Sequence, residues 1–147
     1  MSQNKEYLHI GVTQIRVRYG ETDQMGYCYY GNYAQYFEVG RVEALRELGM
    51  SYKDLESKGF MLPVSNYSVA YKAPALYDDL LTITTKITEL KGARLSFEYE
   101  ITNEENKLLS TADTVLVFVD KERMRPVHPP KEFIAILNSN KPEIDAE

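Results

Sequence analysis

The sequence predicts an α+β fold in which an antiparallel β-sheet is wrapped around one long helix. Apolar residues recur at spacings of three and four over residues 33–48, which is the period of an amphipathic helix. From residue 81 onward apolar and polar residues alternate instead, as in strands with one solvent-facing side. The apolar face of such a sheet needs a cover, and the helix, about 25 Å long at 1.5 Å per residue, is long enough to supply it.

Length and composition indicate one domain over residues 1–147. The chain has 44% hydrophobic residues with only 8 Gly and 6 Pro, which is a globular composition. We expect residues 1–9 and 140–147 to be frayed. No apolar run approaches the roughly 20 residues that span a bilayer, and the first thirty residues have no secretory pattern. These features predict a cytoplasmic protein without a membrane span.

Charge and the small number of metal-binding residues argue against two kinds of partner. The net charge is −5 and no run of Lys or Arg could follow a phosphate backbone, so we do not expect nucleic acid as a partner. The single cysteine, Cys28, cannot form an intramolecular disulfide, and His9 and His128 are the only histidines. Their spacing is not that of a zinc site, and we expect no metal.

A turn separates the first strand from the long helix. Apolar residues at 12, 15, 17 and 19 predict the strand, and Thr-Asp-x-x-Gly at residues 22–26 is typical of a turn. The helix over residues 32–48 follows, and Gly49 is well placed to end it. Gly40 lies inside the helix at a cost of about 0.5–1 kcal/mol relative to Ala, which suggests close approach to a strand.

The remaining elements follow the helix in a simple order. Ser51 and Asp54 predict a capped shorter helix that ends near Gly59, and residues 61–71 are expected to be extended. Strands around residues 81–87 and 95–101 are separated by turns at 90–93 and 103–106, so consecutive strands can pair as an antiparallel meander. Residues 115–119 are apolar on both faces and are expected to form the most buried strand, and residues 131–138 a short terminal helix.

The turn places one carboxylate, that of Asp23, beside the start of the long helix. A helix start offers unpaired backbone N–H groups and the positive end of the macrodipole, so it can polarise a carbonyl or stabilise an oxyanion close to that acid. This combination is suited to cleaving an acyl group. The alternative is that Asp23 only forms an Asx turn or caps the helix.

Six residues in this region form a signature. They are Arg16, Val17, Thr22, Asp23, Gly26 and Tyr33. The segment resembles the active-site signature of the 4-hydroxybenzoyl-CoA thioesterase family of the hotdog-fold superfamily, which includes acyl-CoA thioesterases associated with the Tol-Pal system. Similarity continues through residues 32–46, 71–74 and 78–79. The resemblance implies a hotdog fold, with the sheet wrapped around one long central helix, that pairs edge to edge into homodimers or homotetramers with active sites at the subunit interface.

The resemblance also implies an activity, the hydrolysis of an acyl-CoA thioester to free acid and coenzyme A. Asp23 stands at the position of the catalytic aspartate, which acts as general base or as nucleophile. Tyr30 stands where a backbone N–H points at the thioester oxygen, and a main-chain donor does not depend on the side chain. Gly26, Tyr29 and Tyr33 are candidate substrate-binding residues. Coenzyme A is part of the substrate, so we expect no separate cofactor.

Aromatic side chains around the turn have two possible roles. The rings of five tyrosines could line an acyl tunnel, although packing in a core or an interface is the favoured role of each ring taken singly. These are Tyr27, Tyr29, Tyr30, Tyr33 and Tyr36. The segments 71–74 and 78–79 are expected to form a strand end and its connection, without a chemical role.

Other polar residues are assigned structural roles. Cys28 has no histidine nearby in sequence to activate it and is expected to be buried and inert. Lys91 and Arg94 could contact coenzyme A phosphates, but solvated surface positions are favoured. Glu38 and Arg41, three residues apart on the helix, could form a surface ion pair or support the site from behind, and the structural role is favoured.

Three other functions were weighed against thioester hydrolysis. A Ser-His-Asp hydrolase is disfavoured because Gly-x-Ser-x-Gly is absent. Hydration or dehydration of an acyl thioester on the same fold normally relies on a histidine, and none lies between His9 and His128. A non-catalytic acyl-thioester-binding or scaffold protein, in which Asp23 is only a turn residue, remains the alternative.

Overall fold

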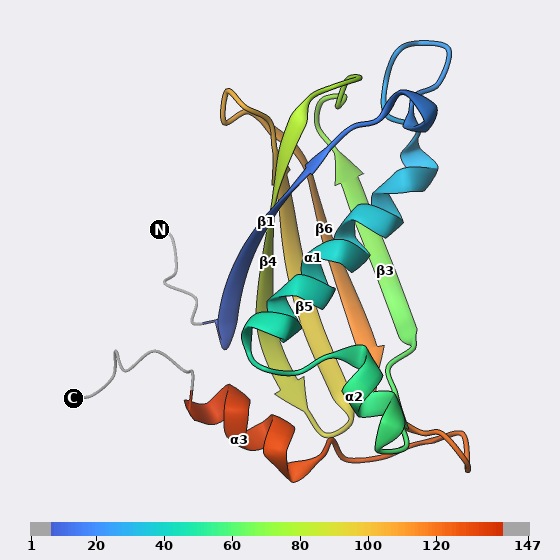
Figure 1. The fold of residues 1–147 in the computed structure, drawn as a ribbon, viewed down its shortest axis with the longest axis vertical. Coiled ribbons are helices and arrows are strands. Elements are labelled where there is room, and N and C mark those ends of the chain that lie inside the picture. Colours follow the sequence, from blue (N-terminus) through green and yellow to red (C-terminus); the bar gives the residue numbers. More distant parts are fainter. Residues whose placement is uncertain (1–6, 140–147) are drawn as a thin grey trace, which may run out of the picture.

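The computed structural model describes residues 7–139, and its main element is a five-stranded antiparallel sheet in the order β1-β4-β5-β6-β3 (Figure 1). The strands are β1 (His9–Arg16), β3 (Val64–Tyr71), β4 (Leu80–Lys91), β5 (Arg94–Thr102) and β6 (Leu108–Val117). Strands β4, β5 and β6 are consecutive in sequence and adjacent in the sheet, as the predicted meander requires. Strands β1 and β3 form the two edges.

The central strands alternate between buried and half-buried side chains, so one face of the sheet forms the core. Fully buried side chains of β4 and β5 occupy every second position. They are Leu81, Ile83, Thr85 and Ile87 on β4, and Leu95, Phe97, Tyr99 and Ile101 on β5. The turn between these strands includes Gly92 at φ +61°, a conformation that glycine adopts without strain. The strict alternation explains why the sequence predicted these strands.

Helix α1 (Tyr33–Glu47) crosses the core face of the sheet and packs mainly against β1 and β4 (Figure 1). Its buried side includes Phe37, Ala44 and Leu45, none of which is measurably exposed. The helix is the expected long helix, beginning one residue later than predicted and ending one residue earlier, and Gly49 follows it with φ +85°. The sheet therefore wraps around α1, and this is the predicted α+β architecture.

Gly40 confirms the close approach of helix and sheet that its position predicted. A Cβ atom built on Gly40 would lie 2.9 Å from Ile83 Cγ2 and closer still to Thr85 Oγ1. Separations below 3.0 Å are essentially never seen for real Cβ atoms, so any larger residue must push α1 away from β4.

A second group of elements lies at the end of the sheet opposite the turn that precedes α1 (Figure 1). Helix α2 (Tyr52–Ser57) begins at Ser51, whose side chain accepts a hydrogen bond from the Asp54 N–H at 3.1 Å, as the predicted cap requires. A small sheet of β2 (Phe60–Met61), β7 (Val119–Asp120) and β8 (Arg125–Pro126) follows. Helix α3 (Lys131–Ser139) packs Phe133 against Phe118, with ring centroids 5.2 Å apart.

Two predicted extended segments each divide into two strands, and the prediction for residues 61–71 is otherwise confirmed. Residues 61–71 divide into β2 and β3, because the chain leaves the small sheet at Met61 and Pro63 cannot donate to either ladder. Residues 115–119 divide between β6 and β7 at Phe118. This segment is not the most buried strand, since alternate residues of β6 are only half-buried on the outer face.

The expected frayed ends fall largely outside the structure. Residues 1–6 and 140–147 are outside the described residues. At the other end of the expected segment 1–9, His9 is already part of β1 and the Leu8 N–H donates to the Ile87 carbonyl at 2.8 Å. Within residues 7–139, no helix is long and apolar enough to cross a membrane.

We predict that Gly40→Ala destabilises the protein by about 1–3 kcal/mol, because the added methyl overpacks the contact between α1 and β4. The measurement is the free energy of unfolding from urea denaturation. Gln35→Ala, at an exposed position of the same helix, serves as the control and should change it by less than about 0.5 kcal/mol. A more stable Gly40→Ala variant would contradict the close contact, because it would mean that only helix propensity had changed.

Candidate active site

A cavity of about 350 Å³ opens at the end of the sheet where the turn meets the start of α1. Two segments that are distant in sequence form its walls, namely residues 23–33, from the turn to the first residue of α1, and residues 71–74, where the chain leaves the edge strand β3. The lining residues are Asp23, Met25, Tyr27, Cys28, Tyr30, Tyr33, Tyr71, Lys72, Ala73 and Pro74. The walls are largely aromatic and apolar, with one carboxylate and one ammonium group.

Asp23 is held by the turn that it helps to form. Its Oδ1 atom accepts hydrogen bonds from the backbone N–H groups of Met25 at 2.9 Å and Tyr27 at 3.2 Å. Its backbone N–H donates to the Tyr27 carbonyl at 2.8 Å, and Gly26 completes the turn at φ +80°. Among the described residues, Oδ2 has no hydrogen-bond partner. The Asx turn therefore fixes one carboxylate oxygen and leaves the other available at the cavity.

The backbone donor of Tyr30 lies on a single 3₁₀ turn, residues Tyr30–Asn32, that leads directly into α1. Within residues 7–139, the N–H groups of Tyr30 and Gly31 find no acceptor. Such unpaired donors are expected at a helix start, where the macrodipole also favours negative charge. The Tyr30 side chain is 66% exposed, so its backbone rather than its ring is the fixed element.

Tyr33 and Tyr71 form the inner aromatic wall. Their ring centroids lie 5.1 Å apart in an edge-to-face arrangement. Tyr33 is buried at 2% exposure, and this burial raises the pKa of its hydroxyl to about 12. Tyr71 is 48% exposed and stands at the rim. The inner ring therefore stays neutral at physiological pH and offers an apolar surface to an acyl group.

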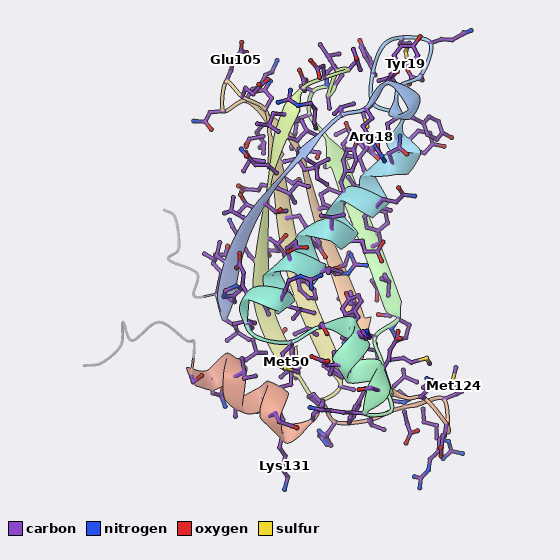
Figure 2. The ribbon with its side chains drawn as sticks, viewed as in Figure 1. Arg18, Tyr19, Met50, Glu105, Met124 and Lys131 are labelled. Atoms are coloured by element: carbon purple, nitrogen blue, oxygen red, sulfur yellow. The ribbon has the colours of Figure 1, made fainter. Side chains whose placement is uncertain are left out.

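A hydrogen-bonded chain lies behind the cavity and connects the end of β1 to α1. Glu21 accepts from the Arg18 guanidinium at 2.9 Å and from the Tyr36 hydroxyl at 2.8 Å, and Tyr36 in turn accepts from the Cys28 thiol at 3.4 Å. Figure 2 shows Arg18 beside the N-terminal part of α1. Partial burial acts to raise the pKa of Glu21, but these hydrogen bonds outweigh it and lower the pKa.

Burial raises the pKa of the Cys28 thiol, and the thiol is 5% exposed. A thiol that resists ionisation is a poor nucleophile. The hydroxyl of Tyr36 is also kept neutral, since burial raises its pKa as well. These side chains therefore support the wall of the cavity rather than react within it.

Sequence comparison identifies the family of this chain. Residues 17–137 match the family described as the thioesterase-like superfamily. The chain belongs to this superfamily. It is 38% identical over 121 residues to the acyl-CoA thioester hydrolase YbgC of Escherichia coli, which covers 82% of this chain and 90% of that protein.

Solved structures of the superfamily have the same fold. A DHNA-CoA thioesterase from Staphylococcus aureus is 32% identical and superposes with a TM-score of 0.85, over 88% of this chain and 89% of that chain. A 4-hydroxybenzoyl-CoA thioesterase variant in complex with 4-hydroxybenzoyl-CoA is 22% identical, with a TM-score of 0.80 over 88% of this chain and 99% of that chain. The sheet wrapped around α1 is therefore the hotdog fold, as the resemblance implied.

The structure brings together only some of the residues that the sequence suggested. Asp23, Tyr30 and Tyr33 line one cavity. Gly26 and Tyr29 are not among its lining residues, because Gly26 only shapes the turn and the Tyr29 ring folds over Gly31, where an added Cβ would meet it at 2.6 Å.

Sequence reasoning missed one wall of the cavity. It gave residues 71–74 no chemical role, yet all four line the cavity. Their match to the family signature was the available signal. Lys91 and Arg94 instead flank the β4–β5 turn, at the far end of β4 from the cavity.

The prediction of a surface ion pair between Glu38 and Arg41 is also wrong. Arg41 is buried, and its guanidinium donates to the hydroxyls of Tyr52 at 3.0 Å and Tyr99 at 3.4 Å. Within residues 7–139 it forms no ion pair with a carboxylate. Glu38 faces solvent, because position 38 lies on the exposed side of α1 while position 41 turns toward the sheet. Arg41 therefore stabilises the core rather than the helix surface.

We predict that Glu21→Gln lowers the free energy of unfolding by about 1–3 kcal/mol at pH 7, because the variant loses a charged acceptor for Arg18 and Tyr36. The folded state lowers the pKa of Glu21 below its ordinary value of 4.5, so the carboxylate contributes stability above that pH. This contribution disappears as pH falls through the lower, folded-state pKa, and the two proteins should then converge. Denaturation curves between pH 7 and pH 3 measure the difference.

The control for this prediction is Glu100→Gln. Glu100 forms a partly exposed pair with Lys86 at 3.6 Å, and removing it should change stability by less than about 1 kcal/mol. A constant difference between wild type and Glu21→Gln across the whole pH range would contradict the role given to the carboxylate charge.

Proposed function

We propose that this chain hydrolyses acyl-CoA thioesters to a free acid and coenzyme A. One observation carries the proposal: Asp23 and Tyr30, whose backbone N–H finds no acceptor among the described residues, line one cavity at the start of α1. The name of the Escherichia coli relative, acyl-CoA thioester hydrolase, supports this substrate class. The largely apolar walls suit the acyl part of such a substrate.

The proposed reaction uses one hydrogen-bond donor, the Tyr30 N–H, and one carboxylate, that of Asp23. The thioester carbonyl oxygen accepts a hydrogen bond from the Tyr30 N–H, which stabilises the negative charge that develops as the carbonyl is attacked. On the other side of the carbonyl, Asp23 acts through Oδ2 either as the general base that takes a proton from water or as the nucleophile itself. In the first route the activated water attacks the carbonyl carbon, the C–S bond breaks, and the proton held by Asp23 passes to the departing coenzyme A thiolate. In the second route the carboxylate forms a mixed anhydride with the acyl group as the C–S bond breaks, and water then hydrolyses the anhydride to the free acid and restores Asp23.

Two features of Asp23 support this assignment over a purely structural one. The Asx turn uses Oδ1 alone, so turn formation and catalysis do not compete for the same oxygen. The two backbone N–H groups that donate to Oδ1 also hold the carboxylate in one orientation, which a general base or nucleophile needs in order to act on a positioned substrate. No cofactor takes part in the proposed reaction, because coenzyme A enters with the substrate.

We predict that Asp23→Asn reduces thiol release by about 10²–10⁴-fold, because the amide neither accepts a proton nor attacks the carbonyl. Asparagine keeps the Oδ1 acceptor of the Asx turn, so the melting temperature should stay close to that of the wild type. The assay is release of free thiol from a panel of acyl-CoAs with short, long and aromatic acyl groups.

A matched control separates chemistry from turn formation. Asp120 accepts hydrogen bonds through Oδ1 from the N–H groups of Glu122 at 2.9 Å and Arg123 at 3.2 Å, in a turn at the far end of the molecule. Asp120→Asn should leave thiol release unchanged. Equal turnover by the wild type and Asp23→Asn would refute the mechanism. Acyl-CoA binding without turnover by the wild type would favour the alternative, a non-catalytic acyl-thioester-binding or scaffold protein.

We also propose that two copies of the chain pair through the edge strand β3. This strand carries no charged residue and no proline, the devices that usually protect an exposed edge. Its half-exposed side chains include Val64 at 45%, Tyr67 at 42% and Tyr71 at 48%, and the last of these belongs to the cavity rim. A second copy on β3 would cover this edge and bring the partner chain close to the site.

We predict that the protein has a molar mass of at least twice the 16.9 kDa of one chain, either as a homodimer or as a homotetramer. Light scattering coupled to size-exclusion chromatography measures this mass. A single-chain mass across a hundredfold range of protein concentration would contradict pairing through β3.

A further inference from the structure

Asn32 occupies the N-cap position of α1 but does not cap the helix with its side chain. Its Nδ2 group donates instead to the backbone carbonyl of Glu21 at 2.8 Å. The same carbonyl accepts the backbone N–H of Tyr29, also at 2.8 Å. The Glu21 carbonyl oxygen therefore binds the two residues that flank Tyr30 and Gly31, whose N–H groups find no acceptor among the described residues.

The Glu21 carbonyl is itself firmly placed. The Glu21 side chain is held by Arg18 and by the Tyr36 hydroxyl, and Tyr36 is part of the buried face of α1. From Glu21 the chain runs directly to Thr22, which pairs with Cys28, and to Asp23. Glu21 therefore helps to fix both groups. Its carbonyl binds the residues on either side of the donors at 30–31, and Asp23 follows it by two residues in the chain.

The side chain of Asn32 connects the start of α1 to the Glu21 carbonyl. Its backbone N–H donates to the Tyr29 carbonyl at 2.9 Å, which shapes the 3₁₀ turn, and its side-chain amide connects the α1 end of that turn to the Glu21 carbonyl. The amide also lies beside the Cys28 thiol at the cavity wall. Without it, among the described residues, the Tyr29 N–H alone would bind the Glu21 carbonyl, and the α1 end of the turn would lose its hydrogen bond to that oxygen.

We propose that Asn32 is a positioning residue that sets the distance between the Tyr30 N–H donor and the Asp23 carboxylate. This inference rests on the proposed thioester hydrolysis. A displacement of about 1 Å at a reacting centre can reduce a rate by about 100-fold, so a side chain that never touches the substrate can control turnover. Binding of the acyl group depends on the cavity walls instead, and should not require Asn32.

Two substitutions test the role of the amide. Asn32→Asp is isosteric, loses the donor and places a carboxylate beside the Glu21 carbonyl, while aspartate is favourable at a helix start. Asn32→Ala loses the donor without adding a charge. We expect both variants to lower kcat by about 10–100-fold with KM within about threefold of the wild type.

The matched control is Asn103→Asp, the same change in another turn. Asn103 accepts hydrogen bonds through Oδ1 from the N–H groups of Glu105 and Lys107, both at 3.0 Å, and aspartate keeps that acceptor. Its kcat and KM should equal those of the wild type. If both Asn32 variants matched Asn103→Asp in kcat, or if KM rose as much as kcat fell, the positioning role would be overturned.

A second measurement tests the proposal without an activity assay. Amide hydrogen exchange of the full chain, followed by NMR, should show faster exchange of the Tyr29 N–H in both Asn32 variants, with the strands of the sheet unchanged. Exchange that stays as slow as in the wild type would overturn the inference. Should the wild type release no thiol, the proposed function would fail, and exchange of the Tyr29 N–H would still decide for or against the role of Asn32.

Discussion

The close packing of α1 on the sheet is the constraint on which the site depends. Gly40 allows the helix backbone to approach β4, and Phe37 and Leu45 complete the buried contact. Because the helix lies in a fixed place on the sheet, its first turn is fixed at one end of it, beside the chain that leaves β1 and the chain that leaves β3. The core of the hotdog fold therefore decides where the first turn of α1 lies relative to the turn that holds Asp23.

The turn before α1 uses single groups for two purposes. Asp23 forms an Asx turn with one carboxylate oxygen, and its other oxygen has no hydrogen-bond partner among the described residues. Glu21 binds Arg18 and Tyr36 through its side chain and orients the start of α1 through its backbone carbonyl. In both residues the structural role does not exclude a functional one, because separate atoms carry the two. The interpretation of Asp23 as a turn residue and its interpretation as a catalytic carboxylate are therefore compatible.

Much of the fold could be predicted from the sequence because its signals are local. Strands β4 and β5 alternate strictly since one face is core, and Ser51 caps α2 with its own side chain. The break between β6 and β7 at Phe118 could not be predicted from the sequence, because residues 115–119 are all apolar and the hydrophobic pattern does not change there. Of the site, Asp23 and Tyr30 lie close in sequence, whereas residues 71–74 reach the cavity only through the pairing of β3 with β6. The contact between Asn32 and Glu21 likewise depends on tertiary geometry.

A crystal structure of Asp23→Asn with an unhydrolysed acyl-CoA bound would show where the thioester lies. We predict the thioester oxygen at about 2.7–3.1 Å from the Tyr30 backbone nitrogen, with the carbonyl carbon facing the side chain at position 23 and the acyl group against Tyr33 and Tyr71. A thioester that binds away from the start of α1, with its carbonyl oxygen bound to other donors, would contradict it.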